Sequence, residues 1–224
     1  MVGGDVVRIA LSKLLGKVTQ AILDQVAELA TVCAASRPGA FFMDRLDSAT
    51  NMSFQASPAF VVVMGVAGCG KSSLGSALAQ AEGLPLIEVD DHHSPTSREK
   101  MRQGIALTDA DREGWLATLG QLLQAQPQGV VLTCSALKKV YRDRLRSACP
   151  GLRFVFLEID RASAGQRVAA RAGTHFFSSA LVDSQFATLE SPVGETGVLT
   201  LDAVLPLSTL AQQTCAWLAM QEVA

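Results

Sequence analysis

A glycine-rich segment followed by Lys-Ser constrains the fold of this 224-residue chain more than any other feature. The run Gly65-Val66-Ala67-Gly68-Cys69-Gly70-Lys71-Ser72 has the spacing G-x-x-x-x-G-K-S, which is typical of a loop that binds phosphate. Its glycines let successive backbone N–H groups point at one anion, where a Cβ atom would interfere. The apolar run Phe60–Met64 precedes the loop, and a helical pattern starts near Lys71. A helix N-terminus adds its positive dipole end at that place, so the segment predicts a nucleotide-binding loop.

Different residues of the loop are expected to bind ATP and Mg²⁺. We expect Lys71 to reach the β- and γ-phosphates and the Ser72 hydroxyl to bind Mg²⁺. Cys69 occupies a variable position of the loop and is assigned no chemistry. The predicted cofactor-binding residues are Gly65, Val66, Ala67, Gly68, Cys69, Gly70, Lys71, Ser72 and Ser73.

From Phe60 onward, short apolar runs alternate with longer amphipathic stretches, which predicts an α/β fold with a five-stranded parallel sheet flanked by helices. The apolar runs read as strands buried on both faces: Phe60–Met64, Leu86–Val89, Val130–Cys134, Arg153–Leu157 and Val198–Leu201. The helical candidates are Lys71–Ala81, Asp109–Gln124, Leu137–Ala148, Ser163–Ala172, Ala180–Leu189 and Thr209–Met220. Thr108 and Asp111 are spaced as an acidic variant of the capping box.

Composition narrows the class of protein. Hydrophobic residues make up 49% and charged residues 18% of the chain, as in a soluble globular protein. A formal charge of -2 gives no reason to expect nucleic acid or an anionic membrane as partner. The five cysteines are scattered without a C-x-x-C pair, so we expect neither a disulfide framework nor a zinc site. This use of cysteine is typical of the reducing cytoplasm, where we expect the protein to be located.

Residues 1–57 differ from the remainder and are predicted to be an N-terminal extension, a helix followed by a linker, ahead of a domain at residues 58–224. Apolar residues at helical spacing run from Leu11 to Leu29, but four charges interrupt them, which excludes a membrane span. Two alternatives stay open. The helix packs on the domain or on a second subunit, or Met52 is the natural start and the preceding residues come from a wrong start assignment.

The position of the acidic residues distinguishes between classes of nucleotide-binding protein. No N-K-x-D segment occurs, which argues against a GTPase. The run Val130–Cys134 ends without the aspartate of a mechanical ATPase, whereas Glu88-Val89-Asp90-Asp91 follows the strand after the phosphate loop. Ligands of α/β sheets bind at the carboxyl ends of the strands. One of these carboxylates is therefore placed to accept a proton from an acceptor hydroxyl.

Several further motifs occur in a fixed order from about Val61 to the C-terminus. They are Glu88-Val89-Asp90-Asp91-His92-His93 with Lys100-Met101, Gly104 to Arg112 with Trp115-Leu116, Cys134-Ser135-Ala136-Leu137-Lys138-Lys139-Val140-Tyr141-Arg142-Asp143, His175-Phe176, and Ser184-Gln185-Phe186-Ala187-Thr188-Leu189-Glu190. In this set the chain resembles the gluconokinase family. The resemblance implies a P-loop kinase fold with a mobile lid, and transfer of the ATP γ-phosphate to the 6-hydroxyl of D-gluconate. It also implies a homodimer.

The resemblance also implies roles for single residues. Asp90 matches the acid that holds or deprotonates the acceptor hydroxyl, and Glu88 stands at a Mg²⁺-binding position where the family usually has Asp. His93 and His175 are expected to contact the substrate. Ser94, Ser97 and Ala106 depart from the family pattern, which puts substrate preference in question and leaves the reaction class intact.

Basic residues are needed to bind a sugar acid and to screen the transferred phosphoryl group. Arg112, Lys138 and Arg142 are the predicted substrate-binding residues of this kind, and Lys138 and Arg142 share a helix face. Arg167 and Arg171, also four residues apart, precede Gly173, a pattern that suits a lid carrying arginine onto ATP. Lys71, Asp90, Arg167 and Arg171 form the predicted catalytic set.

Two other functions compete with this one. Shikimate kinase also has an acidic pair after its second strand, but its glycine-rich loop after the third strand is replaced here by Cys134-Ser135-Ala136. A catalytically silent nucleotide-binding module is the alternative from another class. The intact set of Lys71, Ser72 and Asp90 argues against it.

Overall fold

The computed structural model describes residues 58–170 and 179–221, which form a five-stranded parallel sheet in the order β2-β3-β1-β4-β5. The strands are β1 (Ala59–Met64), β2 (Leu86–Glu88), β3 (Gly129–Cys134), β4 (Arg153–Glu158) and β5 (Val198–Asp202). Every strand pairing is parallel. The predicted fold class and strand number are thus confirmed. The predicted extension at residues 1–57 lies outside the described residues.

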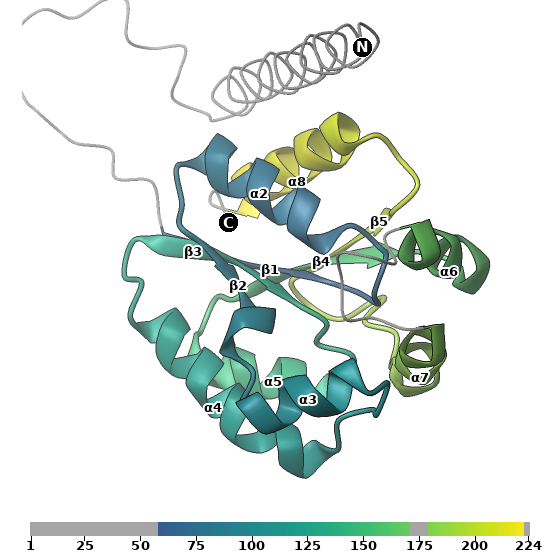
Figure 1. The fold of residues 1–224 in the computed structure, drawn as a ribbon. Coiled ribbons are helices and arrows are strands. Elements are labelled where there is room, and N and C mark those ends of the chain that lie inside the picture. The colour runs from purple at the N-terminus through teal and green to yellow at the C-terminus, as the bar shows by residue number, and fades with distance from the viewer. Residues whose placement is uncertain (1–57, 171–178, 222–224) are drawn as a thin grey trace, which may run out of the picture.

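Helices cover both faces of the sheet (Figure 1). They are α2 (Lys71–Glu82), α3 (Pro95–Arg102), α4 (Asp109–Gln124), α5 (Lys139–Ala148), α6 (Arg161–Ala170), α7 (Ser179–Thr188) and α8 (Leu207–Gln221), with a short 3₁₀ helix η1 (Val89–His92). One buried core lies between the sheet and α2 and α8, and includes Val61, Val63 and Leu78. The other, with Val62 and Leu119, lies beneath α4 and α5.

The carboxyl ends of all five strands lie along one edge of the sheet, because the strands are parallel. Strand register places Glu88 beside Thr133 and Met64 beside Cys134. Helix α2 packs tightly on β3 at Gly75, where an added Cβ atom would lie 2.6 Å from Thr133 Cγ2. This close approach brings the start of α2 to the same edge as the ends of β2 and β3.

The observed elements differ from the predicted ones at particular places. Strands β2 and β5 form the two edges of the sheet and are only partly buried, so the prediction that all five strands are buried on both faces is wrong for these two. Helix α3 and η1 were not predicted. Ser94 accepts a hydrogen bond from Ser97 N and Pro95 follows it, which is a recognisable start of a helix.

Two helix starts illustrate how local hydrogen bonds set the boundaries. The capping box at α4 is confirmed: Asp111 N donates to Thr108 Oγ1 and Thr108 N donates to the Asp111 carboxylate. Helix α6 starts two residues before the predicted Ser163, because the Asp160 carboxylate accepts the Ser163 N–H at 2.9 Å and caps the helix.

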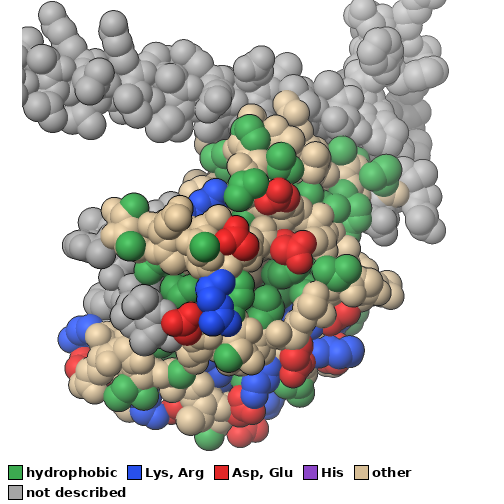
Figure 2. All heavy atoms as spheres, turned by 90° about the vertical axis from the view of Figure 1, so that its right-hand side faces the viewer, with side chains coloured by type: hydrophobic (Ala, Val, Ile, Leu, Met, Phe, Trp, Pro, Cys, Tyr) green, Lys and Arg blue, Asp and Glu red, His purple; other side chains and the backbone are tan. Residues whose placement is uncertain are grey.

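The surface and the thiols bear on the expected environment of the protein. Acidic and basic side chains are interspersed over the face shown in Figure 2. Within the described ranges, no helix combines the length and the hydrophobicity needed to cross a bilayer. Cys69, Cys134 and Cys149 are free and buried, whereas Cys215 is disulfide-bonded. The cysteines are therefore not all unpaired.

Candidate active site

The phosphate-binding loop connects β1 to α2 in a conformation that requires its glycines. Gly65, Gly68 and Gly70 have φ angles of 141°, 83° and 105°, values that side chains disfavour. A Cβ atom on Gly65 would lie 2.8 Å from Leu157 O, and one on Gly68 would lie 2.7 Å from Ala164 O. The sequence G-x-x-x-x-G-K-S therefore folds into a concave loop at the N-terminus of α2, which suits an anion.

Lys71 folds back over this loop. Its Nζ atom donates to the carbonyl oxygens of Gly65 at 3.2 Å and Val66 at 3.1 Å. Among the described carboxylates, none forms an ion pair with this ammonium group. Its positive charge is therefore available to a phosphate in the loop.

Three oxygen-bearing side chains meet where β2, β3 and α2 approach one another. Glu88 Oε2 accepts hydrogen bonds from Ser72 Oγ, at 3.2 Å, and from Thr133 Oγ1. Mg²⁺ prefers oxygen ligands and in phosphate-binding sites needs only one or two from the protein. Ser72 and Glu88 fit that requirement, with Thr133 orienting the carboxylate. The structure thus brings together the two predicted metal-binding residues.

A cavity of about 290 Å³ adjoins the loop on the side of α6 and α8. It is lined by Cys69, Gly70, Ser73, Arg167, Ala170, Ala203, Leu205, Leu207 and Leu210. Arg167 donates to Ala203 O at 3.0 Å and lies 3.5 Å from the carbonyl oxygens of Gly68 and Cys69. The mixture of apolar side chains and one guanidinium beside a phosphate loop suits the remainder of a nucleotide.

A second cavity, of about 70 Å³, lies at the carboxyl ends of β2 and β3, and we call it the acceptor pocket. It is lined by Asp90, His93, Met101, Ala106, Leu107, Arg112, Trp115, Ser135, Ala136, Leu137, Tyr141, Leu181, Ser184, Gln185 and Thr188. Asp90 comes from η1, directly after β2. Its carboxylate has no hydrogen-bond or ion-pair partner among the described residues. Asp90 is therefore free to accept a proton or a hydrogen bond from a ligand.

His93 forms one wall of this pocket. Its ring stacks on Trp115, with centroids 4.6 Å apart and an interplanar angle of 10°, while Trp115 Nε1 donates to Val89 O. The side chain is 7% exposed, and Nδ1 is buried without a hydrogen-bond partner. Burial lowers the pKa of His93 below its ordinary value, against the opposing effect of the Asp90 charge. A neutral imidazole with one unused polar atom suits contact with a hydroxyl group.

Arg112 also faces the acceptor pocket, beside a set of polar groups that hold one another. Arg112 lies 5.6 Å over the ring of Tyr141 and donates to its hydroxyl at 3.4 Å. That hydroxyl in turn donates to Asp109, whose other partner is Lys138 at 2.8 Å. The hydrogen bond from Lys138 is the main cause that lowers the pKa of Asp109. Arg112 is thus in the pocket, and Lys138 reaches its wall only through Asp109 and Tyr141.

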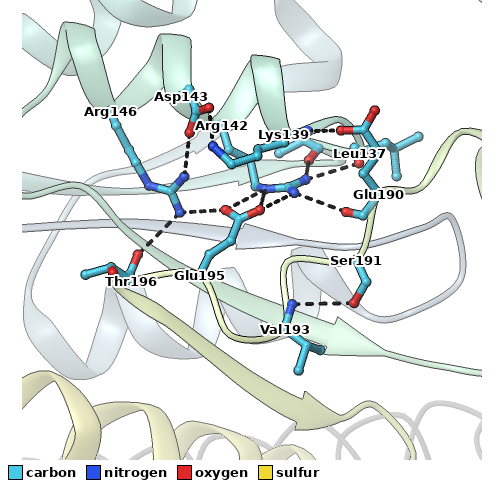
Figure 3. A network of polar contacts seen from close by, with 11 residues as sticks. Leu137, Lys139, Arg142, Asp143, Arg146, Glu190, Ser191, Val193, Glu195 and Thr196 are labelled. Atoms are coloured by element: carbon cyan, nitrogen blue, oxygen red, sulfur yellow. Dashed lines mark hydrogen bonds and ion pairs between the residues drawn. The ribbon is translucent and has the colours of Figure 1, made fainter.

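Arg142 is not in the acceptor pocket, which contradicts the prediction that it binds substrate. Its side chain is 0% exposed. The guanidinium is surrounded by the Glu195 carboxylate, with Nη2 to Oε1 at 2.5 Å, and by the Glu190 carbonyl oxygen (Figure 3). The prediction that Lys138 and Arg142 share a helix face is wrong, because α5 begins at Lys139 and Lys138 is its extended N-cap residue, while Arg142 points inward. The segment at residues 190–195 supplies the charge that makes this burial tolerable.

The remaining donors of Arg142 hold the turn that lines the acceptor pocket. Nη1 donates to Ala136 O at 2.9 Å and to Leu137 O at 3.1 Å. Ala136 has a φ angle of 43°, a left-handed conformation that costs an alanine about 1 kcal/mol. The backbone of Glu190 adds a bond from its N–H to Leu137 O at 2.9 Å. Arg142 therefore holds the backbone of Ala136 and Leu137, two residues that line the acceptor pocket, without lining the pocket itself.

Sequence reasoning identified part of this site and missed part of it. Arg171 and His175 lie outside the described residues, so their roles stay predictions. Thr133 and Gln185 were assigned no role: Gln185 stands inside the motif around Ser184, whereas the position of Thr133 beside Glu88 follows only from the observed strand register. Tyr141 and Asp109 stood inside recognised motifs, yet their contacts depend on packing between α4 and α5.

Comparisons with known proteins agree with this geometry. Residues 60–192 match the family described as "AAA domain". The gluconokinase of Gluconobacter oxydans is 44% identical over 138 residues, which cover 60% of this chain and 77% of the relative. The thermoresistant gluconokinase of Escherichia coli is 38% identical over 68% of this chain and 89% of the relative. A crystal structure of a gluconokinase from Sinorhizobium meliloti superposes with a TM-score of 0.69 at 45% identity, over 75% of this chain and 95% of that one.

Proposed function

The chain belongs to the gluconokinase family, and we propose that it transfers the γ-phosphoryl group of Mg·ATP to the 6-hydroxyl of D-gluconate. The products are 6-phospho-D-gluconate and ADP. The observation that carries the proposal is the Asp90 carboxylate, which has no partner among residues 58–170 and 179–221 and lies in a pocket at the same sheet edge as the phosphate loop. Phosphoryl transfer needs this juxtaposition of an acceptor-binding acid and a bound γ-phosphate.

In this reaction Asp90 accepts the proton of the 6-hydroxyl. The hydroxyl oxygen forms a bond to the γ-phosphorus, and the oxygen that bridges the β- and γ-phosphates leaves with ADP. The loop N–H groups and Lys71 stabilise the charge on the phosphates. Ser72 and Glu88 would hold Mg²⁺, which supplies further neutralisation of that charge.

The sugar acid occupies the acceptor pocket. The Arg112 guanidinium binds its carboxylate, since it faces the cavity and has no carboxylate partner within the described ranges. His93 forms a hydrogen bond to one of its hydroxyl groups through Nδ1, the buried polar atom left unpaired. Arg167 contacts the nucleotide from α6, and the family resemblance adds Arg171 as a catalytic residue and His175 as a substrate-binding residue.

Turnover of D-gluconate tests the proposal most directly. We expect ADP release with Mg·ATP and D-gluconate, and none above background with shikimate or with no acceptor. Lys71→Ala should reduce kcat about 100-fold or more, because it removes a charge that stabilises the transferred group. Lys139→Ala serves as the matched control, since its ammonium is exposed and paired with Asp143. Nucleotide binding without turnover on any sugar acid would contradict the proposal and favour a silent module.

The role of Asp90 has its own test. Asp90→Asn should lower kcat by about 10²–10⁴-fold, the usual contribution of a general base. The KM for ATP should change little. The neighbouring Asp91 is exposed and does not line the pocket, so Asp91→Asn should retain activity. Full turnover by Asp90→Asn would show that another group takes the proton.

Assembly and location complete the proposal. We propose a kinase domain at residues 58–224, a homodimer and a cytoplasmic location, on the grounds of family resemblance. Sedimentation of the full chain tests the dimer, and a single species of 23.6 kDa would contradict it.

A further inference from the structure

Gln185 links the acceptor pocket to the phosphate-binding loop. Its Oε1 atom accepts a hydrogen bond of 2.6 Å from Ala67 N in the phosphate loop, a residue 118 positions earlier in the chain. The same side chain lines the acceptor pocket. Leu181, Ser184 and Thr188 line that pocket too, and their spacing from Gln185 defines one face of α7. One face of this helix thus forms the wall between the acceptor pocket and the loop.

The bond to Ala67 fixes which way the carboxamide points. A backbone N–H can only donate, so the side-chain atom facing it must be the oxygen. The NH₂ group therefore points away from that N–H. No described residue accepts a hydrogen bond from it. Two donors remain for a ligand at the boundary of the acceptor pocket.

The polar groups around this boundary match a sugar acid poised for phosphorylation. Asp90, Arg112 and Ser184 line the same cavity as Gln185, while Ala67 belongs to the loop that holds the phosphates. We propose that the Gln185 side chain connects the two substrate-binding sites. Its oxygen positions the phosphate loop, and its NH₂ group donates a hydrogen bond to a hydroxyl oxygen of the sugar acid. This inference rests on the proposed function, and names a binding residue of the same site.

Because one side chain serves both sites, binding of the two substrates must be coupled. A sugar acid held by the NH₂ group restrains the amide, and the restrained amide holds the loop at Ala67. Coupling of this kind is reciprocal, so each substrate tightens the other by the same factor. We expect D-gluconate to lower the dissociation constant of Mg·β,γ-imido-ATP about fivefold or more.

Two substitutions separate the two contacts of the amide. Gln185→Glu keeps an oxygen for Ala67 N–H but loses the donors, so the KM for gluconate should rise about tenfold or more. The dissociation constant of Mg·β,γ-imido-ATP alone should stay within about twofold. Gln185→Met loses both contacts and should abolish the coupling, so that gluconate no longer changes nucleotide affinity. Gln212→Glu, on the exposed face of α8, controls for the added charge and should behave as wild type.

Calorimetric titration of the nucleotide analogue, with and without saturating D-gluconate, decides the outcome alongside steady-state kinetics. A wild-type coupling factor that persists in Gln185→Met overturns the inference, as does an unchanged gluconate KM in Gln185→Glu. Equal losses of nucleotide and gluconate affinity in Gln185→Glu also overturn it, since they indicate general disruption. If wild type itself does not turn over gluconate, the proposed function fails, and the inference fails with it.

Discussion

At the scale of single residues, two buried ionisable side chains near the acceptor pocket behave oppositely. Arg142 is 0% exposed and fully hydrogen-bonded, so it acts as structure. His93 is 7% exposed with an orphaned Nδ1, so it keeps a polar atom for a ligand. Burial alone therefore does not tell a functional group from a structural one. The decisive quantity is the number of hydrogen-bonding atoms that the protein itself satisfies.

Replacing Arg142 should unfold the protein more readily than replacing an exposed arginine. Arg142→Met leaves the Glu195 carboxylate, whose side chain is 15% exposed, without its main partner. We expect a loss of about 3 kcal/mol in the free energy of unfolding, measured by urea titration. Arg144→Met is the control, because Arg144 is 48% exposed and its ion pair with Glu113 spans 3.5 Å. It should cost less than about 1 kcal/mol, and equal losses in both variants would contradict this account.

His93 should make stability depend on pH. Its pKa is lowered in the folded protein, mainly by burial, so the unfolded chain binds the proton more tightly. The contribution is complete above the unfolded pKa of about 6.5 and is lost as pH falls from there towards the folded value. The urea concentration at the midpoint of unfolding should therefore decrease as the pH is lowered from 7.5 to 5.5. His93→Phe keeps a ring on Trp115 and should flatten this dependence, whereas substitution of the exposed His92 by Gln should not.

At the scale of elements, the site depends on how closely α2 and α7 approach the sheet and loop. Periodicity and motif spacing predicted α2, α4 and all five strands, because apolar patterns, the phosphate-loop motif and the capping box are all local signals in the sequence. Sequence analysis failed to predict the side-chain positions that depend on polar contacts between residues far apart in the chain. Arg142 points inward because Glu195 lies 53 positions later, and Gln185 reaches Ala67 across 118 positions. No local pattern in the sequence contains those distances.

Gly75 tests the approach of α2 to β3. In Gly75→Ala the new Cβ atom would lie 2.6 Å from Thr133 Cγ2, so α2 must shift and separate Ser72 from Glu88. We expect a loss of about 1–3 kcal/mol in the free energy of unfolding and a raised KM for Mg·ATP. Gly114→Ala is the matched control on α4, where the added Cβ atom meets nothing within 4 Å. The free energy of unfolding of that variant should increase by about 0.5–1 kcal/mol. A neutral Gly75→Ala would mean that α2 and β3 are not held at this spacing.

At the scale of the whole molecule, the site is assembled from one sheet edge and from both helical layers. The loop before α2 supplies the phosphate cradle, η1 supplies Asp90, and α4 supplies Arg112. Each of these pieces is anchored in one of the two buried cores. A ligand that spans the loop and the metal-binding residues therefore ties separate layers together.

Mg·ATP should consequently stabilise the folded state. At about 100 times its dissociation constant, a ligand adds roughly 2.7 kcal/mol to the free energy of unfolding, which corresponds to a rise in Tm of about 5–11 °C for a chain of this size. Scanning calorimetry with and without excess EDTA measures the share due to the metal. Ser72→Ala should lose most of the magnesium-dependent part. A magnesium effect that is undiminished in Ser72→Ala would place the metal elsewhere.

The bond between Arg142 and Glu195 also has a consequence for synthesis on the ribosome. A nascent chain that has reached Ala170 already contains β1 to β4 and the phosphate loop, but not the carboxylate that neutralises Arg142. Burying an unmatched guanidinium is costly, so α5 cannot dock natively until residue 195 has left the exit tunnel. Polypeptides cut short before that point should accumulate as partly folded species that engage chaperones. Native folding of the first three quarters of the chain therefore depends on synthesis of the last quarter.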